Sequence, residues 1–345
     1  MPLARLGPEV VSLSAMKAFS RENGISRRAF GAAAGICLAG AIAPGAESGT
    51  EPGIRPLAGS EVESLPDGST GRISEFRGAE GTYVACYLRR PKGPGPFPVV
   101  AILHGNAANK EATYNMGRMR PPASVFGAAG WAVFSIDFRP TTVPLRVPGG
   151  AIVFPPHPPI EWHDTLAAIE AVRHQPFIDG KRVAVMSGSH GGDVMSKVIS
   201  RADLRCGILC SPAIFDLVEL SKAMDNNVPM IQRIKEKVAQ GEQKYGAPMA
   251  EIAKHPVEYG YESAFMEVPK VRCAVMIING RNDTSSPVSV MEAYAEKLRA
   301  NGKEVEMCTP DNAPHGFYFA SPKPIPETEE AARRAVAFIR KHFDQ

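Results

Sequence analysis

Three residue types that act together in acyl transfer each follow an apolar run of the chain. Ser189 stands in R-V-A-V-M-S-G-S-H-G-G, Asp283 in I-I-N-G-R-N-D, and His315 in D-N-A-P-H-G-F. A histidine can take the proton of a serine hydroxyl, and an aspartate can hold that histidine in the required tautomer. The three residues therefore predict nucleophilic catalysis through an acyl-enzyme.

Small residues surround Ser189, as a nucleophile on a tight strand-to-helix turn requires. Ser187 lies two positions before Ser189, and Gly191 lies two positions after it. Bulky side chains would not fit in the crowded turn that exposes such a nucleophile above a sheet. The usual pattern is G-x-S-x-G, and this chain has Ser187 in place of the first glycine. Taken alone, the pattern also fits an ordinary glycine turn before a helix.

The positions of the three residues along the chain agree with a single site. Each is expected just after a strand, and ligands bind at the carboxyl edge of parallel sheets. Ser, Asp, His is also the order that serine hydrolases built on such a sheet use. Asp311, which is close to His315 in the sequence, is the alternative acid.

A fourth apolar run, A-I-L-H-G-N, also ends in a turn. A backbone N–H in this turn can face the developing oxyanion, together with the N–H of His190, the residue after the nucleophile. We expect the donor in the turn to be Asn106, with Gly105 as the second choice. His104 is expected to hydrogen-bond neighbouring loops. A catalytic imidazole at His190 is the weaker alternative to its backbone role.

Apolar runs that alternate with amphipathic stretches are expected to position these residues. The runs are short and rich in Val and Ile, as in strands that are buried on both faces. The expected strands are 82–90, 98–103, 131–137, 182–187, 205–210, 272–279 and 303–309. The expected helices include 161–175, 190–201, 289–301 and 327–343. This alternation predicts an α/β fold with a mostly parallel sheet flanked by helices.

Three segments lie outside the alternation. Residues 47–80 are rich in Gly, Pro, Ser and Glu and are expected to form an irregular lead-in. Residues 139–160 are rich in proline, which excludes a long helix and predicts a loop. Residues 212–270 predict a helical insert before the strand that carries Asp283. This insert forms either a lid or a longer crossover.

Together these motifs resemble the α/β-hydrolase superfamily across residues 82–345. H-G-N, S-G-S-H-G-G, G-R-N-D-x-x-x-P and P-H-G-F carry the resemblance, which points to dienelactone-hydrolase-like esterases and prolyl-oligopeptidase-type catalytic domains. It implies the α/β-hydrolase fold with an eight-stranded, mostly parallel sheet, and no cofactor. The peptidases usually carry a β-propeller before this domain, and none is expected here because little chain precedes residue 82. Dienelactone hydrolases use a cysteine where this chain has Ser189.

Three functions are open at this point. The first is a carboxylesterase that cleaves a small-molecule ester by the Ser-His-Asp mechanism. The second is a prolyl-oligopeptidase-like serine peptidase that acts on short peptides. The third, a non-catalytic binding protein with this fold, is disfavoured because a complete triad has no structural reason to be present.

The first 46 residues predict an export signal. Arg27 and Arg28 precede a weakly hydrophobic stretch of Gly and Ala, and small residues follow up to Ala46. The stretch resembles a twin-arginine signal, so we expect recognition by the twin-arginine export machinery and a periplasmic or secreted bacterial protein. The mature hydrolase domain would then span 47–345. An N-terminal helix of that domain is the alternative, and it fits poorly because the stretch lacks a polar face.

Charge, hydropathy and cysteine spacing limit which partners and ligands are expected. The chain has 39 Lys and Arg against 36 Asp and Glu, and the excess lies in the predicted signal, so nucleic acid is not an expected partner. After the first fifty residues no apolar run is long enough to span a bilayer, so no stable membrane anchor is expected. The six cysteines lack metal-binding spacing, and no metal site is expected. We expect buried free thiols, as in a protein that folds in the reducing cytosol before export.

Overall fold

The computed structural model describes residues 53–81, 83–105, 117, 121–138, 145–146, 152–153, 160–214, 216–223, 231–256, 258–259, 261, 263–319 and 325–345. All of them belong to one of two compact units of the chain, Glu51–Gln345. The other unit, Met1–Thr50, lies outside the described residues, and so does the predicted export signal.

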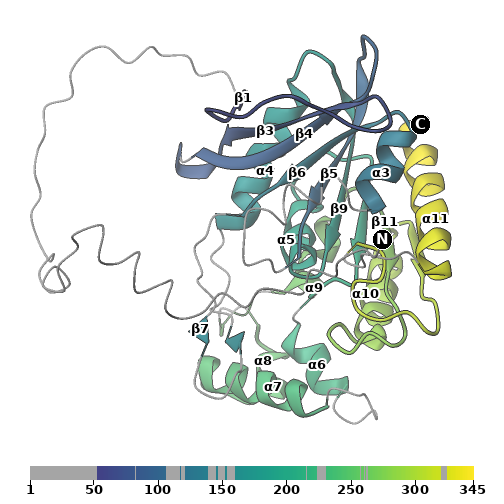
Figure 1. Cartoon of the computed structure of the whole chain (residues 1–345). Coiled ribbons are helices and arrows are strands. Elements are labelled where there is room, and N and C mark those ends of the chain that lie inside the picture. The colour runs from purple at the N-terminus through teal and green to yellow at the C-terminus, as the bar shows by residue number, and fades with distance from the viewer. Residues whose placement is uncertain are drawn as a thin grey trace, which may run out of the picture. The chain divides into compact units, whose positions relative to one another are not determined.

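A ten-stranded sheet with helices on both faces forms the centre of the described unit (Figure 1). Its strands are β1 (Ile54–Pro56), β2 (Glu63–Ser64), β3 (Thr70–Arg77), β4 (Tyr83–Arg90), β5 (Phe97–Leu103), β6 (Ala132–Ile136), β9 (Ile178–Gly188), β10 (Cys206–Cys210), β11 (Ala274–Ile278) and β12 (Val305–Cys308). The order is β1-β3-β4-β6-β5-β9-β10-β11-β12, and β2 pairs with β3. Neighbours from β6 to β12 pair in parallel, whereas the pairs that involve β1 to β4 are antiparallel.

The predicted fold class is confirmed by this sheet. Every strand expected from the sequence is present, with ends that differ by a few residues. The expected number of eight strands was too small, because β1 and β2 pair with β3 and extend the sheet at its antiparallel side.

The continuous apolar runs give the central strands two buried faces. In β5, Val99, Ala101 and Leu103 join the core on one face, and Val100 and Ile102 join it on the other. This is the alternation of side chains that a strand imposes. The first face is covered by α4 (Ile160–Arg173), α5 (His190–Val198) and α10 (Val288–Ala300), and the second by α3 (Pro121–Ala128) and α11 (Pro326–Phe343).

The lead-in 47–80 is not irregular throughout, and that prediction was wrong. It contains β1, β2, β3 and the 3₁₀ turn η1 (Ala79–Gly81). In β3 the buried positions are Gly71, Ser74 and Phe76. Because small and polar residues occupy most of these positions, the strand lacks the Val and Ile signal by which the others were recognised.

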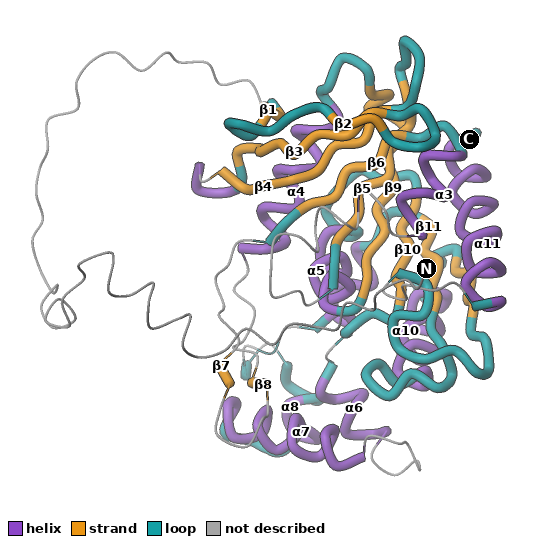
Figure 2. Tube along the Cα trace, in the orientation of Figure 1, coloured by secondary structure: helices purple, strands orange, loops and turns teal. Residues whose placement is uncertain are grey.

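The two segments that interrupt the alternation differ in structure. Within 139–160, β7 (Leu145–Arg146) and β8 (Ile152–Val153) pair antiparallel, α4 begins at Ile160, and the remainder lies outside the described residues. The insert 212–270 is helical, as predicted, and contains α6 (Leu217–Ala223), α7 (Ile231–Tyr245), α8 (Met249–Ile252), α9 (Ala264–Glu267) and the 3₁₀ turn η2 (Val268–Lys270). Helices α6, α7 and α8 lie together beyond one end of the sheet (Figure 2). Their action as a lid stays a prediction.

Candidate active site

Ser189 occupies the turn between β9 and α5. Its backbone has φ 48° and ψ −115°, a conformation that residues other than glycine rarely adopt, so the turn is strained. Added side chains would not fit on either side of it. A Cβ at Gly188 would lie 2.7 Å from the Phe319 ring, and one at Gly191 would lie 2.7 Å from the carbonyl oxygen of His104. The turn is therefore as crowded as the sequence predicts.

Ser187 stands where the common motif has its first glycine. It is a fully buried residue of β9, paired with Leu103 of β5 and Leu209 of β10. Because this position belongs to the regular strand and not to the turn, its hydroxymethyl group is compatible with the conformation of Ser189.

The structure brings Ser189, His315 and Asp283, here called the triad, into one hydrogen-bonded chain. His315 Nε2 lies 3.0 Å from Ser189 Oγ, and His315 Nδ1 lies 2.9 Å from each carboxylate oxygen of Asp283. The His315 side chain is 28% exposed, whereas that of Asp283 is fully buried. An accessible imidazole backed by a buried carboxylate can accept the proton of the serine hydroxyl.

Asp283 is held by its own loop. Its Oδ1 accepts hydrogen bonds from the backbone N–H groups of Ser285 and Ser286, each at 2.8 Å. The alternative acid, Asp311, is 85% exposed and lies 3.3 Å from Arg281 Nε. The geometry therefore favours Asp283 as the partner of His315.

Of the two expected oxyanion donors, His190 and Asn106, the structure describes only His190. His190 is the first residue of α5, where backbone N–H groups have no acceptor within the helix and point out of its amino end, next to Ser189. Asn106 lies outside the described residues. Gly105, the second choice, is close to the nucleophile, since a Cβ on it would lie 3.2 Å from Ser189 Cβ. The Gly191 N–H donates to the His104 carbonyl at 3.1 Å and fixes this turn against the start of α5.

The imidazoles of His104 and His190 each bond to a buried carboxylate. His190 Nε2 lies 2.9 Å from Glu161 Oε2, and His104 Nε2 lies 3.3 Å from Asp137 Oδ1. The Phe138 ring packs against both imidazoles, with centroids 4.5 Å and 5.3 Å away. The predicted structural role of His104 agrees with these contacts, and they favour the backbone role of His190. Sequence reasoning missed both carboxylates, because nothing in their local sequence connects them to the two histidines.

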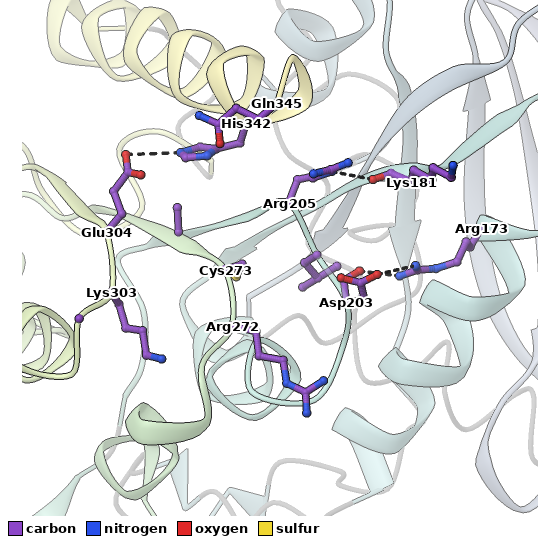
Figure 3. Close-up of a pocket in the computed structure, with 13 residues that line it drawn as sticks. Arg173, Lys181, Asp203, Arg205, Arg272, Cys273, Lys303, Glu304, His342 and Gln345 are labelled. Carbon is purple, nitrogen blue, oxygen red and sulfur yellow. Dashed lines mark hydrogen bonds and ion pairs between the residues drawn. The ribbon is translucent and has the colours of Figure 1, made fainter.

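A separate pocket of about 730 Å³ lies near the amino ends of β10, β11 and β12 (Figure 3). No triad residue lines it. In its wall, Arg173 donates to the carbonyl oxygen of Asp203 at 2.6 Å, and Arg205 donates to that of Lys181 at 2.9 Å. In proteins with an open parallel sheet, ligands bind at the carboxyl ends of the strands, which is the opposite edge. This pocket is therefore not assigned to the substrate.

The described part of the chain offers two further observations. No group of three or more His, Cys, Asp or Glu side chains within it is placed to hold a metal ion. None of the helices that the structure describes has both the length and the apolar character needed to cross a bilayer.

Comparison with known proteins agrees with the fold. The model of the prolyl oligopeptidase family matches residues 160–345. Among solved structures, an esterase of the fungus Rhizomucor miehei superposes with a TM-score of 0.59 at 17% identity, over 82% of this chain and 86% of that one. Acetyl xylan esterase 1 from a Thermoanaerobacterium species gives 0.57 at 16% identity, over 85% and 88%. The acylaminoacyl peptidase of Pyrococcus horikoshii gives 0.55 at 15% identity, over 79% of this chain and 41% of the peptidase.

The sheet, the turn at Ser189 and these matches define an α/β-hydrolase, and within that superfamily a serine hydrolase. The chain belongs to the prolyl oligopeptidase family. It spans only about two fifths of the acylaminoacyl peptidase, 41% of that chain, and most of the length of the two esterases.

Proposed function

We propose that the protein is a carboxylesterase that uses Ser189 as nucleophile, His315 as general base and Asp283 as the acid that orients His315. The unbroken chain of hydrogen bonds from Ser189 Oγ through His315 to Asp283 carries this proposal. His315 takes the proton of Ser189 as the hydroxyl oxygen attacks the ester carbonyl, and Asp283 stabilises the imidazolium that forms.

The remaining steps follow from the same geometry. The N–H of His190, with that of Asn106 or Gly105, binds the oxyanion of the tetrahedral intermediate. The alkoxide leaves with the proton of His315, and the acyl group remains on Ser189. Water then attacks the acyl-enzyme with His315 again as base, which releases the acid and restores the free serine.

The choice of an ester over a peptide rests on how the buried carboxylates are used. An amine is a poor leaving group, so a peptidase must position its substrate closely, and acidic groups that bind the amino terminus are one means. The buried acids among the described residues are Asp137, Glu161, Asp164, Asp216 and Asp283. Each bonds to a group of the protein: His104, His190, the Ala79 N–H, the Glu219 N–H and His315 respectively. This use of the buried carboxylates within the protein supports an ester substrate.

Esterases among the similar structures also support this choice. The Rhizomucor miehei esterase and acetyl xylan esterase 1 share the fold of this chain, as the acylaminoacyl peptidase does. A peptidase acting on short peptides is the second candidate, and the match to the prolyl oligopeptidase family favours it.

A matched pair of substrates separates the two candidates. We expect purified protein to cleave nitrophenyl butyrate with a far higher kcat/KM than butyryl nitroanilide, which differs only in the leaving group. Ser189→Ala should lower kcat by about 10⁴-fold or more while the protein remains folded. An anilide cleaved as efficiently as its ester would reverse the ranking of the two candidates. Ester cleavage that survives in Ser189→Ala would refute the triad.

A further inference from the structure

The residues that follow β10 contact the nucleophile from the side opposite His104. The Ser189 N–H donates to the carbonyl oxygen of Cys210 at 3.0 Å, and the Ala213 N–H donates to the carbonyl oxygen of Ser189 at 2.7 Å. Both polar groups of the strained Ser189 backbone are therefore held by the segment 210–213. None of these residues carries a catalytic side chain in the proposed mechanism.

Ser211, in the middle of this segment, bonds to the loops of the other two triad residues. Its carbonyl oxygen accepts from Ser286 Oγ at 3.1 Å, and the N–H of the same Ser286 donates to Asp283 Oδ1 at 2.8 Å. Its hydroxyl oxygen accepts from the N–H of Gly316, the residue after His315, at 3.1 Å. One buried residue is thus bonded to both the acid loop and the histidine loop.

The backbone of Ser211 has a conformation that serine adopts only under strain. Its φ is 42°, it is 1% exposed, and its N–H donates to the carbonyl oxygen of Ile278 in β11 at 2.7 Å. Glycine would adopt this φ without strain but has no hydroxyl to offer the Gly316 N–H. Backbone strain of this kind is concentrated at functional sites. A strained residue whose hydroxyl has a defined partner beside His315 suggests that the hydroxyl has a role.

We propose that Ser211 is a positioning residue of the triad, whose hydroxyl fixes the histidine loop through Gly316 and so places His315 between Ser189 and Asp283. This inference rests on the proposed function of the triad. Gly316 follows His315 directly, and its N–H is bonded to Ser211. His315 must contact Ser189 and Asp283 at the same time. A small displacement of this loop therefore lengthens both of these hydrogen bonds. Misplacement of a reacting group by about 1 Å lowers rates on the order of 10²-fold.

Two substitutions separate positioning from stability. Ser211→Gly and Ser211→Ala both remove the hydroxyl, but only glycine relieves the strained φ, so Ser211→Gly should have the higher unfolding midpoint of the two. We expect both variants to lower kcat for nitrophenyl butyrate by about 10- to 100-fold with little change in KM. The matched control is Ser200→Ala, which removes another buried serine hydroxyl, bonded to Glu267 away from the triad. It should keep its kcat whatever its unfolding midpoint.

The rate at which a fluorophosphonate modifies Ser189 provides a readout that does not depend on the natural substrate. It should fall in both Ser211 variants, stay unchanged in Ser200→Ala, and be zero in Ser189→Ala. If Ser189→Ala were still modified and active, the triad itself would be wrong. If Ser189→Ala were inactive but Ser211→Gly kept the kcat and modification rate of the native protein, the role of Ser211 would be refuted. The role of Ser211 would also be refuted if the loss of activity in Ser211→Gly, Ser211→Ala and Ser200→Ala simply followed the fall in their unfolding midpoints.

Discussion

At the scale of single residues, burial and contact with His315 distinguish the two candidate acids, although Asp311 is the nearer of the two in the sequence. Asp283 is fully buried and contacts His315, whereas Asp311 is 85% exposed and faces Arg281. We expect Asp283→Asn to lower kcat by about 10⁴-fold, because the amide favours the wrong tautomer of His315. The asparagine Oδ1 can still accept from the N–H groups of Ser285 and Ser286, so the variant should fold.

Asp311→Asn is the matched control for this prediction. It makes the same chemical change four residues before His315, at an exposed site, and should leave kcat near that of the native protein. Esterase kinetics and circular dichroism of both variants measure the effect. A severe loss in Asp311→Asn with a mild one in Asp283→Asn would show that the acid is misassigned.

The sequence predicted the residues of the site that follow strand ends and missed those that come from elsewhere. Ser189, Asp283 and His315 were recognisable because parallel strands bring their carboxyl ends to one edge. Glu161 lies in the first turn of α4, where an acidic residue is common for the helix dipole alone. Ser211 gave no signal, because neither its φ nor its contacts with loops 75 and 105 residues away can be derived from local sequence.

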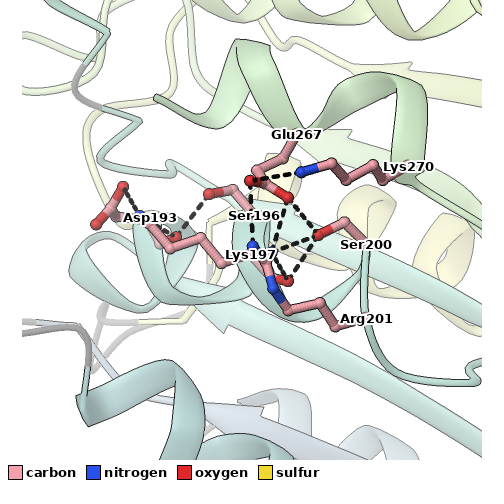
Figure 4. A network of polar contacts seen from close by, with 7 residues as sticks. All are labelled: Asp193, Ser196, Lys197, Ser200, Arg201, Glu267 and Lys270. Atoms are coloured by element: carbon pink, nitrogen blue, oxygen red, sulfur yellow. Dashed lines mark hydrogen bonds and ion pairs between the residues drawn. The ribbon is translucent and has the colours of Figure 1, made fainter. Parts of the chain in front are cut away.

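At the scale of elements, a polar network joins the helix that follows the nucleophile to the insert (Figure 4). Glu267, at the end of α9, accepts from Ser200 Oγ at 2.9 Å and from Arg201 Nη1 at 2.7 Å. Burial alone would raise the pKa of the Glu267 carboxyl, but hydrogen bonds from Arg201 and Ser200 outweigh it and hold this pKa below its ordinary value of 4.5. The network therefore stabilises the protein more when Glu267 is ionised than when it is protonated.

This network predicts a pH-dependent effect of Glu267→Gln on stability. A carboxyl with a depressed pKa in the folded state contributes fully above its unfolded pKa, and the contribution is lost as the pH falls through the folded value. At pH 7 we expect Glu267→Gln to lower the free energy of unfolding by on the order of 1 kcal/mol, since the pair is partly exposed. The difference should shrink as the pH falls below 4.5.

Urea unfolding of both proteins across this pH range measures the difference. Glu296→Gln removes a negative charge from an exposed position of α10 and serves as the control for the change in net charge. A stability difference for Glu267→Gln that stayed constant at acidic pH would contradict the ionic role of the network.

Strands were predicted where they bury apolar side chains on both faces, and missed where their buried residues are small or polar. Strands β5, β9, β10 and β11 are buried on both faces and appear as apolar runs. β3 lies towards the antiparallel side of the sheet and buries mainly small and polar side chains, so its sequence resembles a loop. The first residues of β9, Ile178 to Lys181, were also missed, because they are mostly polar or glycine although they belong to the strand.

At the scale of the whole molecule, the first proposal concerns export. We propose that residues 1–46 direct the chain to the twin-arginine machinery and that the mature protein begins near residue 47. Arg27→Lys combined with Arg28→Lys should stop export and leave the folded enzyme in the cytosol. Mass spectrometry of exported protein should find an amino terminus close to Ala46. Export that persisted in the double variant, or a mature chain that retained both arginines, would refute the proposal.

Export and fold together predict the chemical state of the thiols. Cys86, Cys206, Cys210, Cys273 and Cys308 are buried and free in the structure, whereas Cys37 lies outside the described residues. Burial raises the pKa of all five thiols, well above the ordinary value of 9.0 at Cys86, Cys206 and Cys210 and to about 12 at Cys273. At neutral pH they are therefore protonated and inaccessible, and iodoacetamide should label them only after unfolding.

The route of export determines whether these thiols are still exposed when the chain reaches an oxidising compartment. A chain that folds in the cytosol carries them across already buried, so the exported enzyme should contain no disulfide among the five and be fully active. If residues 1–46 are replaced by a signal that translocates unfolded chains, the same thiols are exposed to oxidants before folding. We then expect disulfide-linked, inactive protein, restored by refolding under reducing conditions. Peptide mapping after alkylation measures both states. Disulfides among these cysteines in enzyme exported with its own leader would contradict folding before export.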